Sequence, residues 1–154
     1  MSLVIYRYGE GETFVLQDVL VTEPVEDGLI ELNLDFSTLE ADGRVVLNGL
    51  FFDVGEDSLL PTSKKSMNKI AEFLKKDPRQ KYYVVGHTDS DGTHELNMNL
   101  SRRRAETVVH ALQDQFGIST DQLFPIGNGA TSPIVANHGE SAKAKNRRVE
   151  LVER

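Results

Sequence analysis

The chain has 154 residues, of which 27% are charged and 39% are hydrophobic, and its formal net charge is −7 at pH 7. This composition is that of a globular protein with one ordinary domain and a short extension, and the acidic balance without a basic arm excludes nucleic acid as an expected partner. The absence of cysteine excludes disulfides, zinc thiolates and thiol catalysis.

The sequence predicts no transmembrane segment in this chain. No apolar run approaches the roughly 20 residues that span a bilayer, and the first residues lack a charged segment followed by an apolar one. The chain begins abruptly at a strand-like segment, which leaves open that a leader or an anchor precedes it.

Residues 1–43 are predicted to form a β-rich extension. Residues 13–21 are rich in β-branched and apolar side chains, and Asp27-Gly28 marks a tight turn. Apolar residues then alternate with polar ones at Ile30, Leu32, Leu34 and Phe36. We therefore expect an N-terminal β-hairpin of unknown role, followed by a separate domain over residues 44–154.

The domain is predicted to open with a strand and a helix. Residues 45–52 are apolar and β-prone, although Asn48-Gly49 within them is also a turn signal. We interpret the segment as one continuous strand. Pro61 opens a helix with a regular apolar stripe, and Asp77-Pro78 closes it.

Strands and helices alternate in the remainder of the domain. We expect strands over residues 81–85, 123–126 and 147–152, a long helix over residues 95–116 with Gly117 as its terminator, and a short helix over residues 141–145. The predicted fold class is α+β, with a β/α/β/α/β order and helices on one face of a mixed sheet.

The buried stripe of the long helix turns polar in its first half. Counting back from Val108 in helical steps gives Arg104, Ser101 and Asn97, and the rise from Asn97 to Arg104 is about 10 Å, the size of a small polar ligand. A guanidinium near a core requires compensation because it cannot shed its charge. Two interpretations stay open: Asp89 or Asp53 pairs with Arg104 to join strand and helix, or the polar patch binds a ligand.

A wider pattern resembles the signature of OmpA-like domains, the C-terminal peptidoglycan-binding module of outer-membrane proteins. The resemblance covers about two thirds of the chain. It is carried by Gly86-His87-Thr88-Asp89, Gly92, Asn97, Leu100-Ser101, Arg104-Ala105 and Val108, and further by Phe52-Asp53, Leu59, Pro61, Gly127-Asn128-Gly129, Pro133, Asn137 and Asn146-Arg147-Arg148-Val149-Glu150. It also favours one continuous strand into Phe52-Asp53.

The resemblance implies a ligand, the stem peptide of peptidoglycan and in particular its diaminopimelate residue. This residue carries both an ammonium and a carboxylate. Asp89 would take the ammonium, and Arg104 would grip the carboxylate with two hydrogen bonds. No cofactor is implied.

Further pocket residues follow from the same resemblance. Thr88, Asn97, Leu100 and Arg148 are expected to line the pocket, with main-chain contacts from Phe52 and Asp53. Two of these have alternatives that stay open. Asn97 could bond local backbone at the start of the helix, and Arg148 could face water at a strand edge.

Catalysis and metal binding find little support in the sequence. His87, Asp89 and Ser101 could suggest a hydrolytic site, but no serine lies in a Gly-x-Ser-x-Gly elbow. The histidines lack ligand spacing, and Asp89-Ser90-Asp91-Gly92 lacks the distal glutamate of a calcium loop. We expect a protein that is not an enzyme and holds no metal.

The predicted function is to anchor an outer-membrane or periplasmic protein to the cell wall. The expected location is the periplasm, with attachment to the outer membrane through a part not present in this chain. The alternative is a domain of the same fold that binds a protein partner in the cell envelope. The oligomeric state is not predicted.

Overall fold

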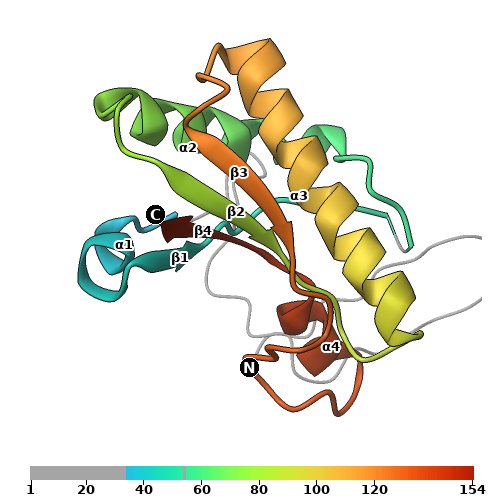
Figure 1. Cartoon of the computed structure of the whole chain (residues 1–154). Helices are drawn as coiled ribbons and strands as arrows, with labels where there is room; N and C mark the ends of the chain where they lie inside the picture. The colour runs from blue at the N-terminus through green and yellow to red at the C-terminus, as the bar shows by residue number, and fades with distance from the viewer. Residues whose placement is uncertain (1–33, 54) are drawn as a thin grey trace, which may run out of the picture. The chain divides into compact units, whose positions relative to one another are not determined.

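The computed structural model describes residues 34–53 and 55–154 of the chain (Figure 1). The chain has two compact units, Met1–Glu31 and Leu32–Arg154, and the described residues belong to the second. The hairpin predicted near the N-terminus lies outside the described residues and stays a prediction.

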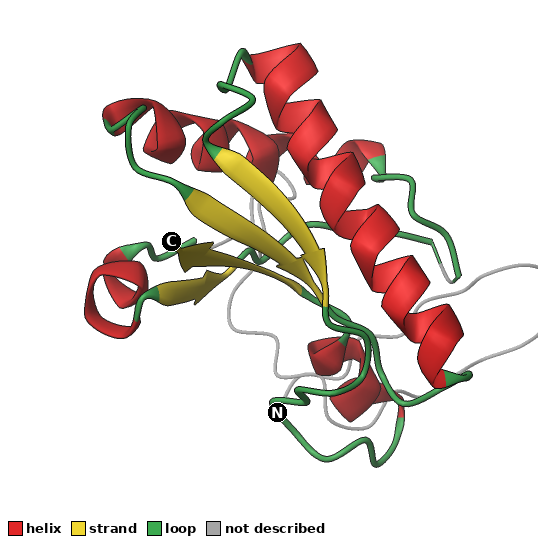
Figure 2. Cartoon of the chain, in the orientation of Figure 1, coloured by secondary structure: helices red, strands yellow, loops and turns green. Residues whose placement is uncertain are grey.

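A mixed four-stranded sheet forms the centre of the unit (Figure 2). Its strands are β1 (Arg44–Val46), β2 (Tyr82–Gly86), β3 (Leu123–Gly127) and β4 (Val149–Glu153), in the order β1-β4-β2-β3. β4 is antiparallel to both of its neighbours, whereas β2 and β3 are parallel. The strands predicted at residues 81–85 and 123–126 are thereby confirmed, and the one predicted at residues 147–152 is present but begins later, at Val149.

The helices in the second half of the unit also agree with the prediction. A 3-10 turn at Pro61–Ser63 leads into α2 (Lys64–Lys76), which is followed by α3 (His94–Phe116) and α4 (Glu140–Asn146). Local signals fix the ends of α3: the Thr93 hydroxyl accepts the Leu96 N–H at 3.2 Å, and Gly117 is left-handed, with φ 69°.

One helix was not expected. Residues 37–42, predicted as part of a β-rich extension, form helix α1 (Ser37–Asp42), and residues 34–36 form no strand. Leu39 is buried, and the ring of Phe36 stacks on that of Phe73 with centroids 4.1 Å apart. The alternating apolar residues at this point therefore contact the core from a turn and a helix.

The predicted continuous strand over residues 45–52 is wrong. β1 ends at Val46, and the chain turns at Asn48-Gly49, where Gly49 adopts φ 80°. Phe52 then pairs only with Leu59, as an isolated bridge. The left-handed glycine takes the chain out of the sheet and leads it towards α3, so the turn signal in the sequence was the correct one.

The helices α1, α2 and α3 cover the same face of the sheet, because they share one hydrophobic core with it. Leu39 of α1, Ile70 of α2 and Val108 of α3 belong to one buried cluster with Val84 of β2 and Leu151 of β4. The predicted α+β class, with helices on one face, is confirmed. No helix of the described residues combines the length and apolar character needed to cross a membrane.

Two glycines let α3 approach the ends of the parallel strands. A Cβ atom at Gly86 would lie 2.0 Å from the carbonyl oxygen of Ser101, and one at Gly127 would lie 2.6 Å from the backbone nitrogen of Arg102. The polar first half of α3 therefore packs directly against the strand end from which the Asp89 loop departs.

Candidate ligand-binding site

Buried polar side chains gather where the loop after β2 meets the first half of α3. The exposed fractions are 4% for Thr88, 7% for Asp89, 6% for Asn97 and 5% for Arg104. Burial of this kind requires hydrogen-bond partners or a bound ligand.

Main-chain carbonyls hold the guanidinium of Arg104. Nε donates to the Glu56 carbonyl at 2.9 Å and Nη2 to the Asp53 carbonyl at 3.1 Å, and the group lies 5.0 Å from the centre of the Phe52 ring. Nη1 donates no hydrogen bond to a described residue, and it is not among the fully buried atoms that lack a partner.

Neither expected carboxylate forms an ion pair with Arg104 in the described part of the chain. Asp53 contributes its carbonyl oxygen, and Asp89 pairs elsewhere. Burial lowers the pKa of Arg104, the nearby guanidinium of Arg147 lowers it further, and Asp89 opposes both effects. An arginine keeps its charge in a protein. Arg104 is therefore a buried cation that is held by carbonyl groups and contacts no carboxylate among the described residues.

The carboxylate of Asp89 is paired with Arg147. Oδ2 lies 2.7 Å from Nη1 of Arg147, and Oδ1 accepts the backbone N–H of Asp91 at 2.9 Å. Arg147 also donates from Nη2 to the exposed carboxylate of Glu140. Arg147 was not among the predicted site residues.

Arg148, the predicted site residue, makes a different set of contacts. Its side chain is 5% exposed, pairs with Glu150 at 2.7 Å and donates from Nη2 to the Ser132 carbonyl at 3.0 Å. Consecutive residues entering a strand point to opposite sides. The expectation had placed Arg148 in the pocket or at a water-facing strand edge, whereas Arg148 is buried against Glu150 and Arg147 is the arginine that contacts Asp89.

Three other predicted residues surround Asp89 and Arg104. Thr88 donates from its hydroxyl to the Asp89 carbonyl at 3.0 Å, and Asn97 donates from Nδ2 to the same oxygen at 3.4 Å. Asn97 therefore bonds the β2 loop across the site and not the backbone of its own helix. Leu100 is half-buried, one helical turn before Arg104.

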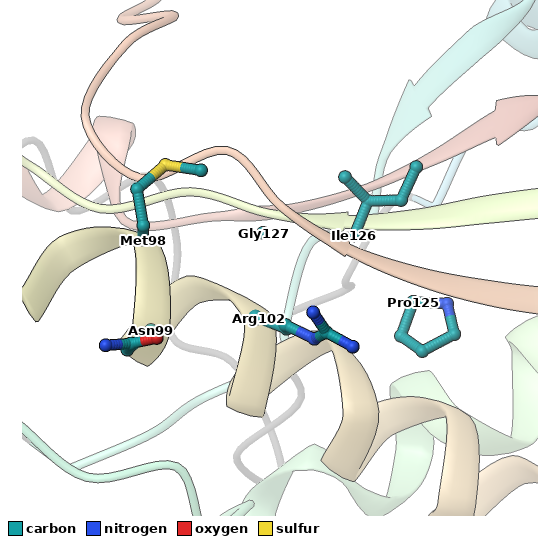
Figure 3. Close-up of a pocket in the computed structure, with 6 residues that line it drawn as sticks. All are labelled: Met98, Asn99, Arg102, Pro125, Ile126 and Gly127. Atoms are coloured by element: carbon teal, nitrogen blue, oxygen red, sulfur yellow. The ribbon is translucent and has the colours of Figure 1, made fainter. Parts of the chain in front are cut away.

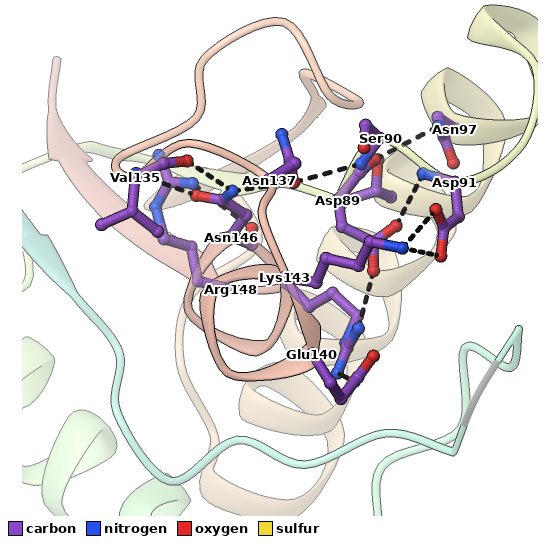
Figure 4. A network of polar contacts seen from close by, with 12 residues as sticks. Asp89, Ser90, Asp91, Asn97, Val135, Asn137, Glu140, Lys143, Asn146 and Arg148 are labelled. Atoms are coloured by element: carbon purple, nitrogen blue, oxygen red, sulfur yellow. Dashed lines mark hydrogen bonds and ion pairs between the residues drawn. The ribbon is translucent and has the colours of Figure 1, made fainter.

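Helix α4 and the segment before it are tied to the Asp89 loop. Lys143 contacts both carboxylate oxygens of Asp91, at 2.7 and 2.8 Å, and Asn137 accepts the Ser90 N–H at 3.3 Å. Asn146 is fully buried and bonds the Asn137 amide oxygen at 2.9 Å (Figure 4). These contacts place the C-terminal end of α4 beside the site.

A separate hollow of about 340 Å³ lies between α3 and β3 (Figure 3). It is lined by Met98, Asn99, Arg102, Pro125, Ile126 and Gly127. None of these is a predicted site residue, and no buried charge faces this hollow.

The side chains considered for hydrolysis are not arranged as a nucleophile and a base. The Ser101 hydroxyl donates to the Met98 carbonyl and accepts the Gly129 N–H, each at 2.9 Å. His87 lies near Glu150, with Nε2 3.8 Å from Oε2, and neither ring nitrogen has a hydrogen-bond partner. The described residues include no group of three or more side chains able to hold a metal ion.

Comparison with known proteins points to one family. Residues 51–147 match a family model described as OmpA family. The chain is 38% identical over 104 residues to the probable lipoprotein YiaD of Escherichia coli (strain K12), a match that covers 68% of the chain and 47% of that protein. It is 37% identical over 106 residues to the peptidoglycan-associated lipoprotein of Legionella pneumophila, covering 68% of the chain and 60% of that protein.

A solved structure gives the same picture. The peptidoglycan-associated lipoprotein of Burkholderia pseudomallei superposes with a TM-score of 0.64 at 30% identity, covering 80% of this chain and 98% of that one. The matches to the two curated relatives span less than two thirds of either relative's length.

Proposed function

Because the chain belongs to the OmpA family, we propose that its domain binds peptidoglycan without chemical turnover, and that it does so through the Asp89–Arg104 site. Two of the similar proteins are named peptidoglycan-associated lipoproteins, which supports this class of ligand. The observation that carries the proposal is the state of Arg104, a guanidinium that is 5% exposed and has no carboxylate partner among the described residues.

The ligand group proposed for the site is the free end of diaminopimelate in the stem peptide. Its carboxylate would accept from Nη1 of Arg104, which carbonyl contacts already orient. Its ammonium would face Asp89. A charged hydrogen bond in a site shielded from water is stronger than a neutral one, and it is also more directional.

The remaining predicted residues support this pair in the proposal. Thr88 and Asn97 fix the main chain of Asp89, and the carbonyl of Asp53 and the ring of Phe52 fix Arg104. Leu100 supplies the apolar border. Arg148, just before β4, lies outside the proposed site and donates to the Ser132 carbonyl. Arg147 replaces Arg148 as the arginine of the site, because it contacts Asp89.

In the cell, the domain would tether a periplasmic or outer-membrane protein to the wall. A single site that binds its ligand through two charged contacts gives micromolar to millimolar dissociation constants, a binding free energy of about −4 to −8 kcal/mol. The repetitive wall raises effective attachment through many equivalent sites. Weak binding at a single site is therefore compatible with firm anchoring.

Thermal unfolding with free meso-diaminopimelate tests the proposal. A ligand of the folded state must raise the melting temperature in a concentration-dependent way. We expect the rise in the parent chain and its loss in Arg104→Gln. Arg102→Gln is the matched control, because Arg102 leaves the same helix towards solvent and pairs with Glu106. Absence of a shift at many millimolar would favour a domain that binds a protein partner.

A further inference from the structure

The free site already contains a cation where the proposed ligand would place its ammonium. Arg147 lies 2.7 Å from the carboxylate of Asp89, and the two side chains are 29% and 10% exposed. The contact is thus partly shielded from water. Hydrogen bonds to Asp89, and secondarily to Glu140, raise the pKa of Arg147.

The buried charges of the free site do not balance. The guanidinium of Arg147 contacts the buried carboxylate of Asp89, and its charge lowers the pKa of Arg104. Asp89 and the partly exposed Asp57 act on Arg104 in the opposite direction. The second anion near Arg147 is Glu140, whose side chain is 76% exposed and therefore well solvated. Among the described residues, the site therefore holds two guanidiniums against one buried carboxylate, and Arg147 already occupies that carboxylate.

We propose that Arg147 determines the ligand specificity of the site by occupying Asp89 until a ligand brings both an ammonium and a carboxylate. This inference rests on the proposed function. The ammonium displaces Arg147 from Asp89, and the carboxylate neutralises the two guanidiniums. A ligand with an ammonium alone would have to displace Arg147 without supplying the missing anion.

The position of α4 makes such an exchange local. Arg147 follows α4 directly, and the helix is fastened independently by Lys143 to Asp91 and by Asn146 to Asn137. The Arg147 side chain can therefore leave Asp89 while these two contacts hold the helix. Glu140 remains as a partner for the displaced guanidinium.

Titration calorimetry with two synthetic tripeptides tests the inference. They differ only in the third residue: in one it is meso-diaminopimelate, whose side chain ends in an ammonium and a carboxylate, and in the other it is lysine, whose side chain ends in an ammonium alone. For the parent chain we expect a preference of about tenfold or more for the diaminopimelate peptide. In Arg147→Gln, the lysine peptide should bind at least about threefold more tightly than in the parent.

Two variants serve as controls for this measurement. Arg147→Lys keeps a cation opposite Asp89 and should retain the preference. Lys145→Gln removes the same charge from an exposed position in the last turn of α4, and it should also retain the preference.

The outcomes separate the two proposals. If the parent binds the diaminopimelate peptide and Arg147→Gln binds the lysine peptide no more tightly than the parent, the role of Arg147 is overturned and the proposed function stands. If the parent binds neither peptide, both fail. Should Arg147→Gln not fold, NMR signals of the Arg147 guanidinium in the parent decide. They must shift when the diaminopimelate peptide is added, and unchanged signals overturn the inference.

Discussion

Arg104 illustrates how a charged side chain is held in a fold without an ion pair. Its guanidinium is planar, and two of its nitrogens donate to carbonyls of the segment that follows the Asn48-Gly49 turn. In the proposed complex, this fixed orientation directs Nη1 towards the carboxylate of the ligand. A lysine ammonium, as a point charge on a flexible stem, would lack this preset direction.

His87 provides a second prediction at the scale of a single residue. Burial, and secondarily the charge of Arg148, lower the pKa of His87 to about 4, although Glu150 acts in the opposite direction. An unfolded chain protonates its histidine near pH 6.5, so between pH 6.5 and 4 it binds more protons than the folded chain. The free energy of unfolding should therefore decrease as the pH falls through this window, by up to roughly 3 kcal/mol, and this loss is absent above it.

Chemical unfolding at pH 7.5, 5.5 and 4 measures this effect. His87→Gln removes the titrating ring at a site of similar size, and its stability should decrease less over the same range. An equal decrease in the variant would show that other groups cause the acid sensitivity.

At the scale of elements, the contact between α3 and the sheet decides where the site forms. The close approach at Gly86 and Gly127 brings the polar half of α3 to the Asp89 loop. A side chain at either position would displace the helix, and with it Arg104. We therefore expect the glycines to be needed for the proposed binding as well as for packing.

We predict that Gly86→Ala destabilises the domain by about 3 kcal/mol and weakens ligand binding. The added Cβ would lie 2.0 Å from a helix carbonyl that cannot move by itself. Gly43→Ala is the control, because no atom lies within 4 Å of its Cβ and only its left-handed backbone, with φ 69°, is strained, which costs about 1–2 kcal/mol. Urea unfolding of both variants gives the comparison. Equal costs would contradict the role of the close approach.

The same elements show what the sequence could and could not predict. The ends of α2 and α3 carry local signals at Pro61, Asp77-Pro78 and Gly117, and these helices were predicted correctly. The turn at Asn48-Gly49 was also visible locally, but the expectation of a continuous strand overrode it. Helix α1 was missed because Leu34 and Phe36 alternate as in a strand and yet pack from irregular backbone.

The sequence could predict the site residues that helical spacing brings together, but not the contacts between segments far apart in the chain. Helical spacing places Asn97 and Arg104 on one side of α3, and both are buried there. The partner of Asp89 depends instead on the register of β4, fifty-eight residues away along the chain, and no local pattern distinguishes Arg147 from Arg148. The carbonyls of Asp53 and Glu56 could not be predicted either, because their direction follows from the course of a loop.

At the scale of the whole molecule, β3 lies at an edge of the described sheet. The Tyr82 N–H donates to the Gln122 carbonyl and the Asn128 N–H donates to the Gly86 carbonyl, so alternate residues of β3 face β2. By this register the backbone nitrogen of Pro125 points away from β2. Because proline has no N–H, the outer edge of β3 has no hydrogen-bond donor at this residue. Proline at such a position protects a sheet against edge-to-edge pairing.

Replacing Pro125 should therefore promote self-association. Pro125→Thr supplies an outward N–H in a β-prone side chain, and we expect a higher mean mass by light scattering at high protein concentration. Pro125→Lys supplies the same N–H together with a charge and should associate less. A Pro125→Thr variant that scatters like the parent would contradict the protective role.

The binding site as a whole is assembled from segments far apart in the sequence. Asp89 comes from the loop after β2, Arg104 from α3, the carbonyls of Asp53 and Glu56 from the segment before α2, and Arg147 from the end of α4. Only the folded domain brings these groups together. Binding should therefore be lost on unfolding and should not reside in any single peptide of the chain.

Sedimentation with purified cell-wall sacculi tests the central claim most directly. The parent chain should pellet with the sacculi, and Asp89→Ala and Arg104→Ala should stay in the supernatant while their circular dichroism spectra show that they remain folded. If both variants pellet as the parent does, the Asp89–Arg104 site does not bind the wall and the account is contradicted.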